Sequence, residues 1–254
     1  MDLGIKGRKA IICASSKGLG KGCAAALAEA GCDIVINGRD KAILAATGRE
    51  LQRFGVSVTE IAGDVSDPGC QRELLAACPQ PDILVNNNGG PPRRDFHELD
   101  RAAILQGVTQ NMVTPIELIQ AVIGGMAERG FGRIVNITSL SVYVPISGLD
   151  LSSGARAGLT SFLSGIARSV AHRNVTINNL LPGKLDTDRL RGAFRQDGSS
   201  DEEQKERLAA DIPARRLGTP EEFGQICAFL CSVHAGYLTG QNIPVDGGAY
   251  LSAF

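Results

Sequence analysis

Short apolar runs alternate with longer amphipathic segments along most of the chain, and this alternation is the feature that most restricts its fold. The runs are rich in β-branched residues and nearly continuous in apolar character, as expected of parallel strands that are buried on both faces. We predict seven strands, at residues 10–13, 33–36, 57–62, 83–86, 133–138, 176–180 and 242–245.

The segments between these runs have the pattern of helices, for example at residues 20–30, 40–54, 68–78 and a long helix at 98–129. Crossovers between parallel strands are nearly always right-handed, so helices cover both faces of the sheet. The prediction is an α/β fold: a doubly wound, mostly parallel sheet in a Rossmann-like three-layer sandwich. With 254 residues and 43% hydrophobic content, one domain over 1–254 accounts for the chain.

Residues 187–212 differ from the rest because they are rich in charge and are interrupted by Gly192 and Gly198. Long insertions in compact domains are often functional, so we predict a lid over a substrate cleft. The alternative is a solvated surface excursion.

The charge balance argues against several classes of partner. A formal net charge of -1 gives no general attraction to nucleic acid or to anionic membranes. The sequence has no secretory signal pattern after Met1 and no apolar stretch of membrane-spanning length, so we expect a cytoplasmic protein with a small-molecule partner.

Seven scattered cysteines indicate reduced, mostly buried thiols. The three histidines lie far apart in sequence, so we predict no metal site.

A glycine-containing turn at residues 14–20 follows the first predicted strand and leads into a helix. Glycines at this place let the backbone approach a pyrophosphate, and the helix N-terminus offers free N–H groups to it. This arrangement is typical of a dinucleotide site.

The turn resembles the Thr-Gly-x-x-x-Gly-x-Gly motif of short-chain dehydrogenase/reductases, with Cys13 and Ala14 in the first two places. The resemblance continues over residues 8–250. Further matches are Asp64-Val65, Asn86-Asn87-Asn88-Gly89 (with Asn88 where the family has Ala), Asn111, Ser139, Pro182-Gly183-Lys184-Leu185-Asp186-Thr187, Gly240-Gln241 and Val245-Asp246-Gly247-Gly248. The branch it resembles is often labelled 3-oxoacyl-carrier-protein reductase.

The resemblance implies a nicotinamide dinucleotide cofactor and a homotetramer built on the helices at 98–129 and 151–173 and on the last strand. It places Asp64 at the adenine and Thr187 at the nicotinamide carboxamide. The cofactor-binding residues that we predict are Ala14, Ser16, Lys17, Gly18, Leu19, Gly20, Arg39, Asp64, Val65, Asn88, Gly89, Pro182, Gly183 and Thr187.

The end of the second predicted strand favours NADP over NAD. NAD enzymes usually place a carboxylate there for the ribose hydroxyls, whereas NADP requires positive charge for its 2′-phosphate. This chain has Asn37-Gly38-Arg39, with Lys17 in the glycine turn. Arg39 can make charge-assisted contacts to a phosphate, so we predict NADP. The alternative is that Lys17 and Arg39 are ordinary solvated surface charges.

The residues that carry proton transfer in the family are replaced here. The resemblance places a Tyr thirteen residues after Ser139 and a Lys four residues later, where an ammonium acidifies a phenol. These positions hold Ser152 and Arg156, and the following Ala157-Gly158 matches the family, which fixes the alignment. A serine hydroxyl is a far weaker acid than a phenol.

Three other residues are candidates for a relocated acid. Tyr143 is either part of the wall of the pocket or the relocated acid. Lys184 is either a surface charge or the proton donor. Asp150 could also reach the cleft, but the sequence gives no reason for a raised pKa.

Beyond Gly89, the run Gly90-Pro91-Pro92 is followed by Arg93-Arg94. These two arginines are either solvated or bind an anionic substrate or the phosphate of a carrier.

Two functional hypotheses follow. The first is an NADP(H)-dependent oxidoreductase acting on a carbonyl or alcohol, and the second is a dinucleotide-binding protein without dehydrogenase activity, such as a sensor, partner subunit or scaffold. In the first hypothesis, the catalytic residues are Ser139, Asn111, Ser152, Arg156, Tyr143 and Lys184.

Overall fold

The computed structural model describes residues 1–90, 93–194 and 200–252, and it confirms the predicted fold class. One sheet of seven parallel strands has the order β3-β2-β1-β4-β5-β6-β7. The strands are β1 (Lys9–Ile12), β2 (Asp33–Gly38), β3 (Val58–Ala62), β4 (Ile83–Asn86), β5 (Gly132–Ile137), β6 (Val175–Pro182) and β7 (Asn242–Val245). The seven predicted strands agree with these to within two residues at each end.

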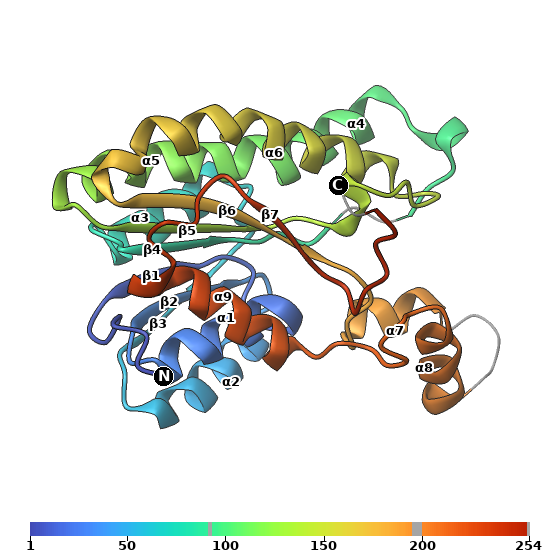
Figure 1. Ribbon diagram of the computed structural model, residues 1–254, viewed down its shortest axis with the longest axis horizontal. Helices are drawn as coiled ribbons and strands as arrows, with labels where there is room; N and C mark the ends of the chain where they lie inside the picture. Colours follow the sequence, from blue (N-terminus) through green and yellow to red (C-terminus); the bar gives the residue numbers. More distant parts are fainter. Residues whose placement is uncertain (91–92, 195–199, 253–254) are drawn as a thin grey trace.

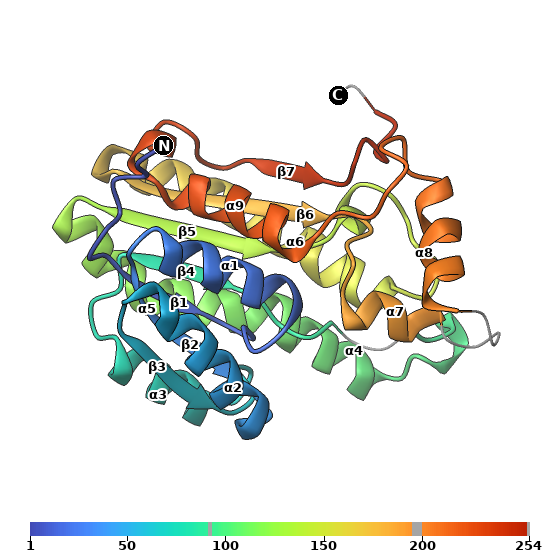
Figure 2. The ribbon, with the colours of Figure 1, turned by 90° about the horizontal axis from the view of Figure 1, so that it is seen from below.

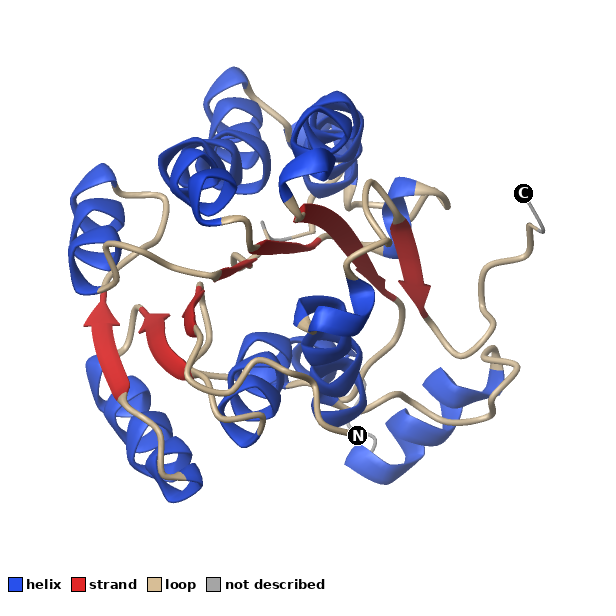
Figure 3. Cartoon of the chain, turned by 60° about the vertical axis from the view of Figure 1, so that its left-hand side comes forward, coloured by secondary structure: helices blue, strands red, loops and turns tan. Residues whose placement is uncertain are grey.

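Helices cover both faces of the sheet and make the three layers visible in Figures 1 and 3. One apolar core lies between the sheet and α1 (Gly18–Glu29), α2 (Lys41–Leu51) and α9 (Pro220–Cys231). The other lies beneath α3 (Pro68–Ala77), α5 (Thr114–Arg129) and α6 (Asp150–Val170). Short 3-10 helices occupy Gln52–Phe54, Phe96–Glu98, Leu140–Val142, Ala171–Arg173 and Val233–Ala235.

Two more helices, α7 (Asp188–Phe194) and α8 (Asp201–Ala210), lie beyond the end of the sheet (Figure 2). They belong to the charged stretch 187–212, of which residues 195–199 are outside the described part of the chain. Across the described residues, no helix has the length and apolar character needed to span a bilayer.

All seven cysteines are buried and unpaired, as predicted. Burial raises the pKa of the Cys13 thiol to about 12, so this residue, which directly precedes the glycine turn, stays neutral.

The prediction of one regular helix over 98–129 was wrong in two respects. The helix begins only at Arg101, because the Asp100 carboxylate accepts a hydrogen bond from the Ala103 N–H and caps α4 (Arg101–Val108). Between α4 and α5 the helix widens into a π turn at Thr109–Val113, which contains Asn111. Such turns occur most often at functional sites.

A row of four asparagine side chains crosses half of the sheet in register. Asn86 Nδ2 donates to Asn136 Oδ1 at 2.9 Å, Asn136 Nδ2 donates to Asn179 Oδ1 at 2.9 Å, and Asn179 Nδ2 donates to Asn242 Oδ1 at 2.7 Å. These residues are also backbone pairing partners on β4, β5, β6 and β7. The first three are buried, so the hydrogen bonds between their amides satisfy polar groups that bulk solvent does not reach.

Asn136 is the central member of this row, and replacing it breaks two bonds. In Asn136→Val, the Asn86 donor and the Asn179 acceptor both lose a partner inside the protein. An unsatisfied buried polar group costs about 1–3 kcal/mol. We expect the free energy of unfolding to fall by about 2–5 kcal/mol, measured by urea unfolding followed by circular dichroism.

Asn242→Val is the matched control, since it breaks only the last bond, at a strand that is partly exposed. We expect it to cost about 1 kcal/mol. Equal losses in the two variants would show that the row adds nothing beyond ordinary local packing.

Candidate active site

The turn between β1 and α1 is held by side chains from two neighbouring strands. Ala14 takes a left-handed backbone with φ 43°, its N–H donates to Asn37 Oδ1 at 3.1 Å, and its carbonyl accepts from Asn87 Nδ2 at 3.0 Å. A non-glycine residue in this conformation carries about 1–2 kcal/mol of strain. The glycine that the family has at this place would avoid that strain.

Gly18 and Gly20 let the turn pack tightly against the start of α1. Gly18 is left-handed with φ 54°, and a Cβ on Gly20 would lie 2.4 Å from the Ala14 carbonyl oxygen. Leu19 lies between them in the first turn of α1, whose N-terminal N–H groups begin after Lys17. The arrangement fits a dinucleotide pyrophosphate.

Positive charge without a competing carboxylate lies at the end of β2. Arg39 is exposed, and its Nη2 lies 3.8 Å from where a Cβ on Gly89 would be. The nearest acid, Asp40, caps α2 by accepting from the N–H groups of Ala42 and Ile43. Ser16 packs its hydroxyl against Gly38, beside the exposed Lys17. These groups suit a phosphate on the ribose.

The residues after β3 and β4 meet the π turn. Asp64 accepts from the Ser66 N–H at 2.9 Å and leads into buried Val65. Asn88 Nδ2 donates to Ser66 Oγ at 2.9 Å and to the Gln110 carbonyl at 3.1 Å. An alanine at position 88 would make neither bond, so Asn88 ties the end of β4 to the π turn.

Ser152 and Arg156 lie one helical turn apart on the buried face of α6 and bind each other. Arg156 Nε donates to Ser152 Oγ at 3.0 Å. Its Nη1 donates to the carbonyls of Ile137 and Thr138, the two residues before Ser139. The guanidinium therefore joins α6 to the end of β5, where the Ser139 hydroxyl accepts from the Ser141 N–H at 3.1 Å.

Arg156 remains a cation at neutral pH. Burial, and secondarily the charge of Arg189, lower the pKa of its guanidinium to about 10. Its three hydrogen bonds offset much of the cost of burying that charge.

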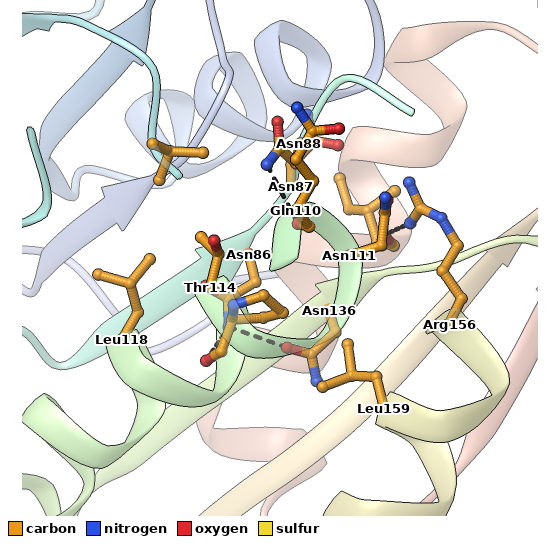
Figure 4. Close-up of a pocket in the computed structure, with 13 residues that line it drawn as sticks. Asn86, Asn87, Asn88, Gln110, Asn111, Thr114, Leu118, Asn136, Arg156 and Leu159 are labelled. Carbon is orange, nitrogen blue, oxygen red and sulfur yellow. Dashed lines mark hydrogen bonds between the residues drawn. The ribbon is translucent and has the colours of Figure 1, made fainter. Parts of the chain in front are cut away.

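A small polar cavity lies beside Arg156 and the π turn (Figure 4). Its volume of about 20 Å³ is enough for a water molecule. Among the described residues that line it, Asn86 Oδ1, Asn111 Oδ1 and Thr114 Oγ1 have no hydrogen-bond partner within the protein. Asn111 Nδ2 donates to the Gly107 carbonyl at 3.1 Å. The cavity therefore offers a water several polar contacts.

The three candidates for a relocated acid lie at different places. Tyr143 is 40% exposed and stacks on Tyr250, with ring centroids 5.0 Å apart. Lys184 Nζ donates to the Leu208 carbonyl at 3.2 Å and pairs with Asp211 at 3.4 Å, at the end of α8. Asp150 is exposed at the start of α6.

The segment after β6 runs along the cofactor turn. Pro182 ends the strand, and the Gly183 N–H donates to the Val245 carbonyl at 3.0 Å. The Thr187 methyl lies 3.6 Å from where a Cβ on Gly18 would be, so the two predicted cofactor segments are adjacent. Pro91 and Pro92, in the run that follows Gly89, are outside the described residues.

Sequence reasoning missed the residues that hold the site together. These are Asn37, which fixes the glycine turn, and the buried row of asparagines on β4 to β6. Asparagine is depleted in strands, and a buried polar group in a strand requires a partner, so asparagines within several predicted strands were a usable signal.

Comparison with known proteins agrees with this geometry. A family model described as enoyl-(acyl carrier protein) reductase matches residues 13–250. The NADPH-dependent reductase BacG of Bacillus subtilis is 31% identical over 96% of this chain and 98% of its own. The 3-oxoacyl-[acyl-carrier-protein] reductase FabG of Pseudomonas aeruginosa is 30% identical over 98% of this chain and 100% of its own.

Among solved structures, L-sorbose reductase from Gluconobacter frateurii, complexed with NADPH and L-sorbose, superposes with a TM-score of 0.93 and 29% identity. The match covers 99% of this chain and 100% of the reductase. The glycine turn, the parallel sheet and similarity over nearly the whole length agree, and the chain therefore belongs to the short-chain dehydrogenase/reductase family.

Proposed function

We propose that this protein is an NADP(H)-dependent oxidoreductase that interconverts a carbonyl and an alcohol through a modified active site. In it, Ser152 and Arg156 replace the phenol and ammonium of the family. The observation that carries the proposal is the set of bonds made by Arg156, which joins Ser152 to the end of β5 directly before Ser139. NADPH dependence of similar reductases supports the choice of cofactor.

The residues that would hold NADP(H) are those of the glycine turn, Arg39, Asp64, Asn88 and Thr187. When bound, the dinucleotide supplies or accepts the hydride. Lys17 and Arg39 pair with the 2′-phosphate, since Asp40 is engaged in capping α2.

Ser152 and Ser139 bind the carbonyl oxygen during reduction. Because Arg156 donates to Ser152 Oγ, the serine proton is directed away from the guanidinium, toward a substrate oxygen. The positive charge also stabilises the alkoxide that develops there. The alkoxide takes its proton from water, with Asn111 and Thr114 binding water in the adjoining cavity.

Tyr143 and Lys184 are structural residues and do not donate the proton. The Tyr143 ring forms a wall of the pocket with Tyr250, and Lys184 anchors α8. Helices α7 and α8, in the stretch 187–212, cover the substrate, supported by the bond from Arg189 to the Gly90 carbonyl.

The same proposal includes a homotetramer. Exposed apolar side chains on α4 and α6, among them Leu105 (53% exposed) and Phe162 (49% exposed), would be buried between subunits. Light scattering at micromolar concentration is expected to give four times the 26.7 kDa chain mass. A monomeric mass would contradict this.

The missing phenol predicts slow reduction of simple ketones, because a positioned general acid contributes about 10² to 10⁴ in rate. The double variant Ser152→Tyr with Arg156→Lys restores the family pair. We expect it to raise the rate of NADPH oxidation by diacetyl, a reactive uncharged diketone, by about 10²-fold. NADPH affinity should stay nearly unchanged, since the binding turn is untouched.

The matched control is Ser153→Tyr with Arg156→Lys, which puts the phenol on a neighbouring position where the native hydroxyl bonds the Leu149 carbonyl. This control should give no gain. The alternative is a dinucleotide-binding protein without dehydrogenase activity. It is favoured if the unaltered protein binds NADPH, no tested ketone supports NADPH oxidation, and the double variant does not raise the rate.

Cofactor preference gives a second prediction. NADPH should bind more tightly than NADH, because a charge-assisted bond from Arg39 is worth about 1.5–3 kcal/mol, or about 10- to 100-fold. Fluorescence titration of both cofactors measures this. Arg39→Asp should abolish the preference, while Arg53→Asp, an exposed cation beside Phe54, should keep it. Equal affinities in the unaltered protein would refute the charge argument.

A further inference from the structure

The carbonyl of Gln110, in the π turn, receives no hydrogen bond of the kind that a regular helix gives. In an α-helix its donor would be the Thr114 N–H, four residues on. That N–H instead donates to the Thr109 carbonyl, five residues back. The next N–H along a π turn would belong to residue 115, which is proline and has none. The helix therefore leaves the Gln110 carbonyl without a donor.

The side chain of Asn88 supplies this donor from outside the helix. Its Nδ2 donates to the Gln110 carbonyl at 3.1 Å and to Ser66 Oγ at 2.9 Å. An amide nitrogen carries two hydrogens, so these two acceptors use both of them. Asn88 therefore fastens the end of β4 to the position of the turn where helical bonding is interrupted.

The turn that Asn88 holds also determines where Asn111 lies. Asn111 is 3% exposed, and its Nδ2 donates to the Gly107 carbonyl at 3.1 Å, while its Oδ1 has no partner within the protein. The residue lines the small polar cavity that Asn88 and Arg156 also line (Figure 4). A buried acceptor of this kind on a polar cavity suits a bound water. A shift of the π turn would move that acceptor.

Two departures from the family pattern meet at this cavity. One is Asn88, where the family has alanine, and the other is Arg156, where the family has lysine. The family takes its proton from a phenol, whereas the proposed function takes it from water. A reaction that depends on water for its proton also depends on the residues that hold this water in place.

We propose that Asn88 is a positioning residue: by bonding the Gln110 carbonyl, it holds the π turn in the register that keeps Asn111 on the cavity beside Arg156. The inference rests on the proposed function and adds a residue that acts through Asn111. The alternative is that the Asn88 side chain serves the dinucleotide. Positioning is favoured because both amide hydrogens are engaged within the protein and because the family binds its dinucleotide with alanine here.

The test is Asn88→Ala, assayed by NADPH oxidation with diacetyl. We expect kcat to fall about tenfold or more, because a small misplacement of a reacting group can cost up to about 10²-fold. NADPH affinity should stay within about twofold. The ratio of kcat in H₂O to kcat in D₂O should rise, since proton transfer from a misplaced water becomes slower. Amide hydrogen exchange over residues 109–115 should quicken about 3- to 10-fold.

Two matched controls break hydrogen bonds near Asn88 or the π turn and leave the bond to Gln110 intact. Ser66→Ala removes the other acceptor of the Asn88 amide. Gln71→Ala removes a bond to Glu117, near the start of α5. Both controls should keep kcat and the exchange rates within about twofold of the unaltered protein.

Pro115→Ala gives the helix a new N–H that can donate to the Gln110 carbonyl. Asn88→Ala should therefore quicken exchange less in this background than in the unaltered protein. A side chain with only a general packing role would give the same effect in both backgrounds, and that result would overturn the proposal.

Unchanged kcat in Asn88→Ala, or an equal loss in either control, would also overturn it. A loss of NADPH affinity with kcat unchanged would assign the side chain to the dinucleotide instead. If the unaltered protein binds NADPH and no ketone supports its oxidation, the proposed function fails by itself. Hydrogen exchange then decides the role of Asn88: faster exchange in Asn88→Ala retains the positioning of the turn, and unchanged exchange overturns it.

Discussion

The amide row from Asn86 to Asn242 fixes how four parallel strands align, and the site depends on that alignment. Parallel strands are joined by long crossovers, so no tight turn sets their register, and a slip of one residue turns every side chain to the other face. Amide pairs close only at matched positions of β4, β5, β6 and β7. The alignment fixes where Asn88, Ser139 and Pro182 lie relative to one another along the strand direction. Each of these residues ends one of the strands or follows it.

Arg156 fixes the position of helix α6 relative to the sheet, as the amide row fixes the strands relative to one another. A buried cation is costly unless its donors are satisfied, and here they are satisfied by Ser152 Oγ and by two carbonyls at the end of β5. The forked guanidinium reaches all three acceptors at once, which a lysine ammonium on a single stem does with poorer geometry. Serine at 152 and arginine at 156 therefore act as a unit in holding α6 to the end of β5.

Periodicity and the glycine turn were sufficient to predict the fold, because buried parallel strands are continuous apolar runs and phosphate turns need glycine. The π turn at Thr109–Val113 was not predictable, since the spacing of its apolar residues is that of an ordinary helix. The hydrogen bond from Asn88 to the Gln110 carbonyl within this turn joins residues that are distant in sequence and meet only in the folded chain. Lys184 was a candidate proton donor by sequence position alone. Its partner Asp211 is 27 residues away, and only the folded chain brings them together.

The proposal that Ser152 and Arg156 take the place of a titrating acid is tested most directly by the pH dependence of NADPH oxidation. The measurement uses the unaltered protein at saturating NADPH, with a carbonyl substrate that turns over. Serine does not titrate in this range, and the pKa of Arg156, lowered to about 10, leaves its charge in place up to about pH 9. A rate that is flat from about pH 6 to about pH 9 is therefore expected. A rate that falls with an apparent pKa between about 7 and 9 would reveal an acid such as a phenol and contradict this account.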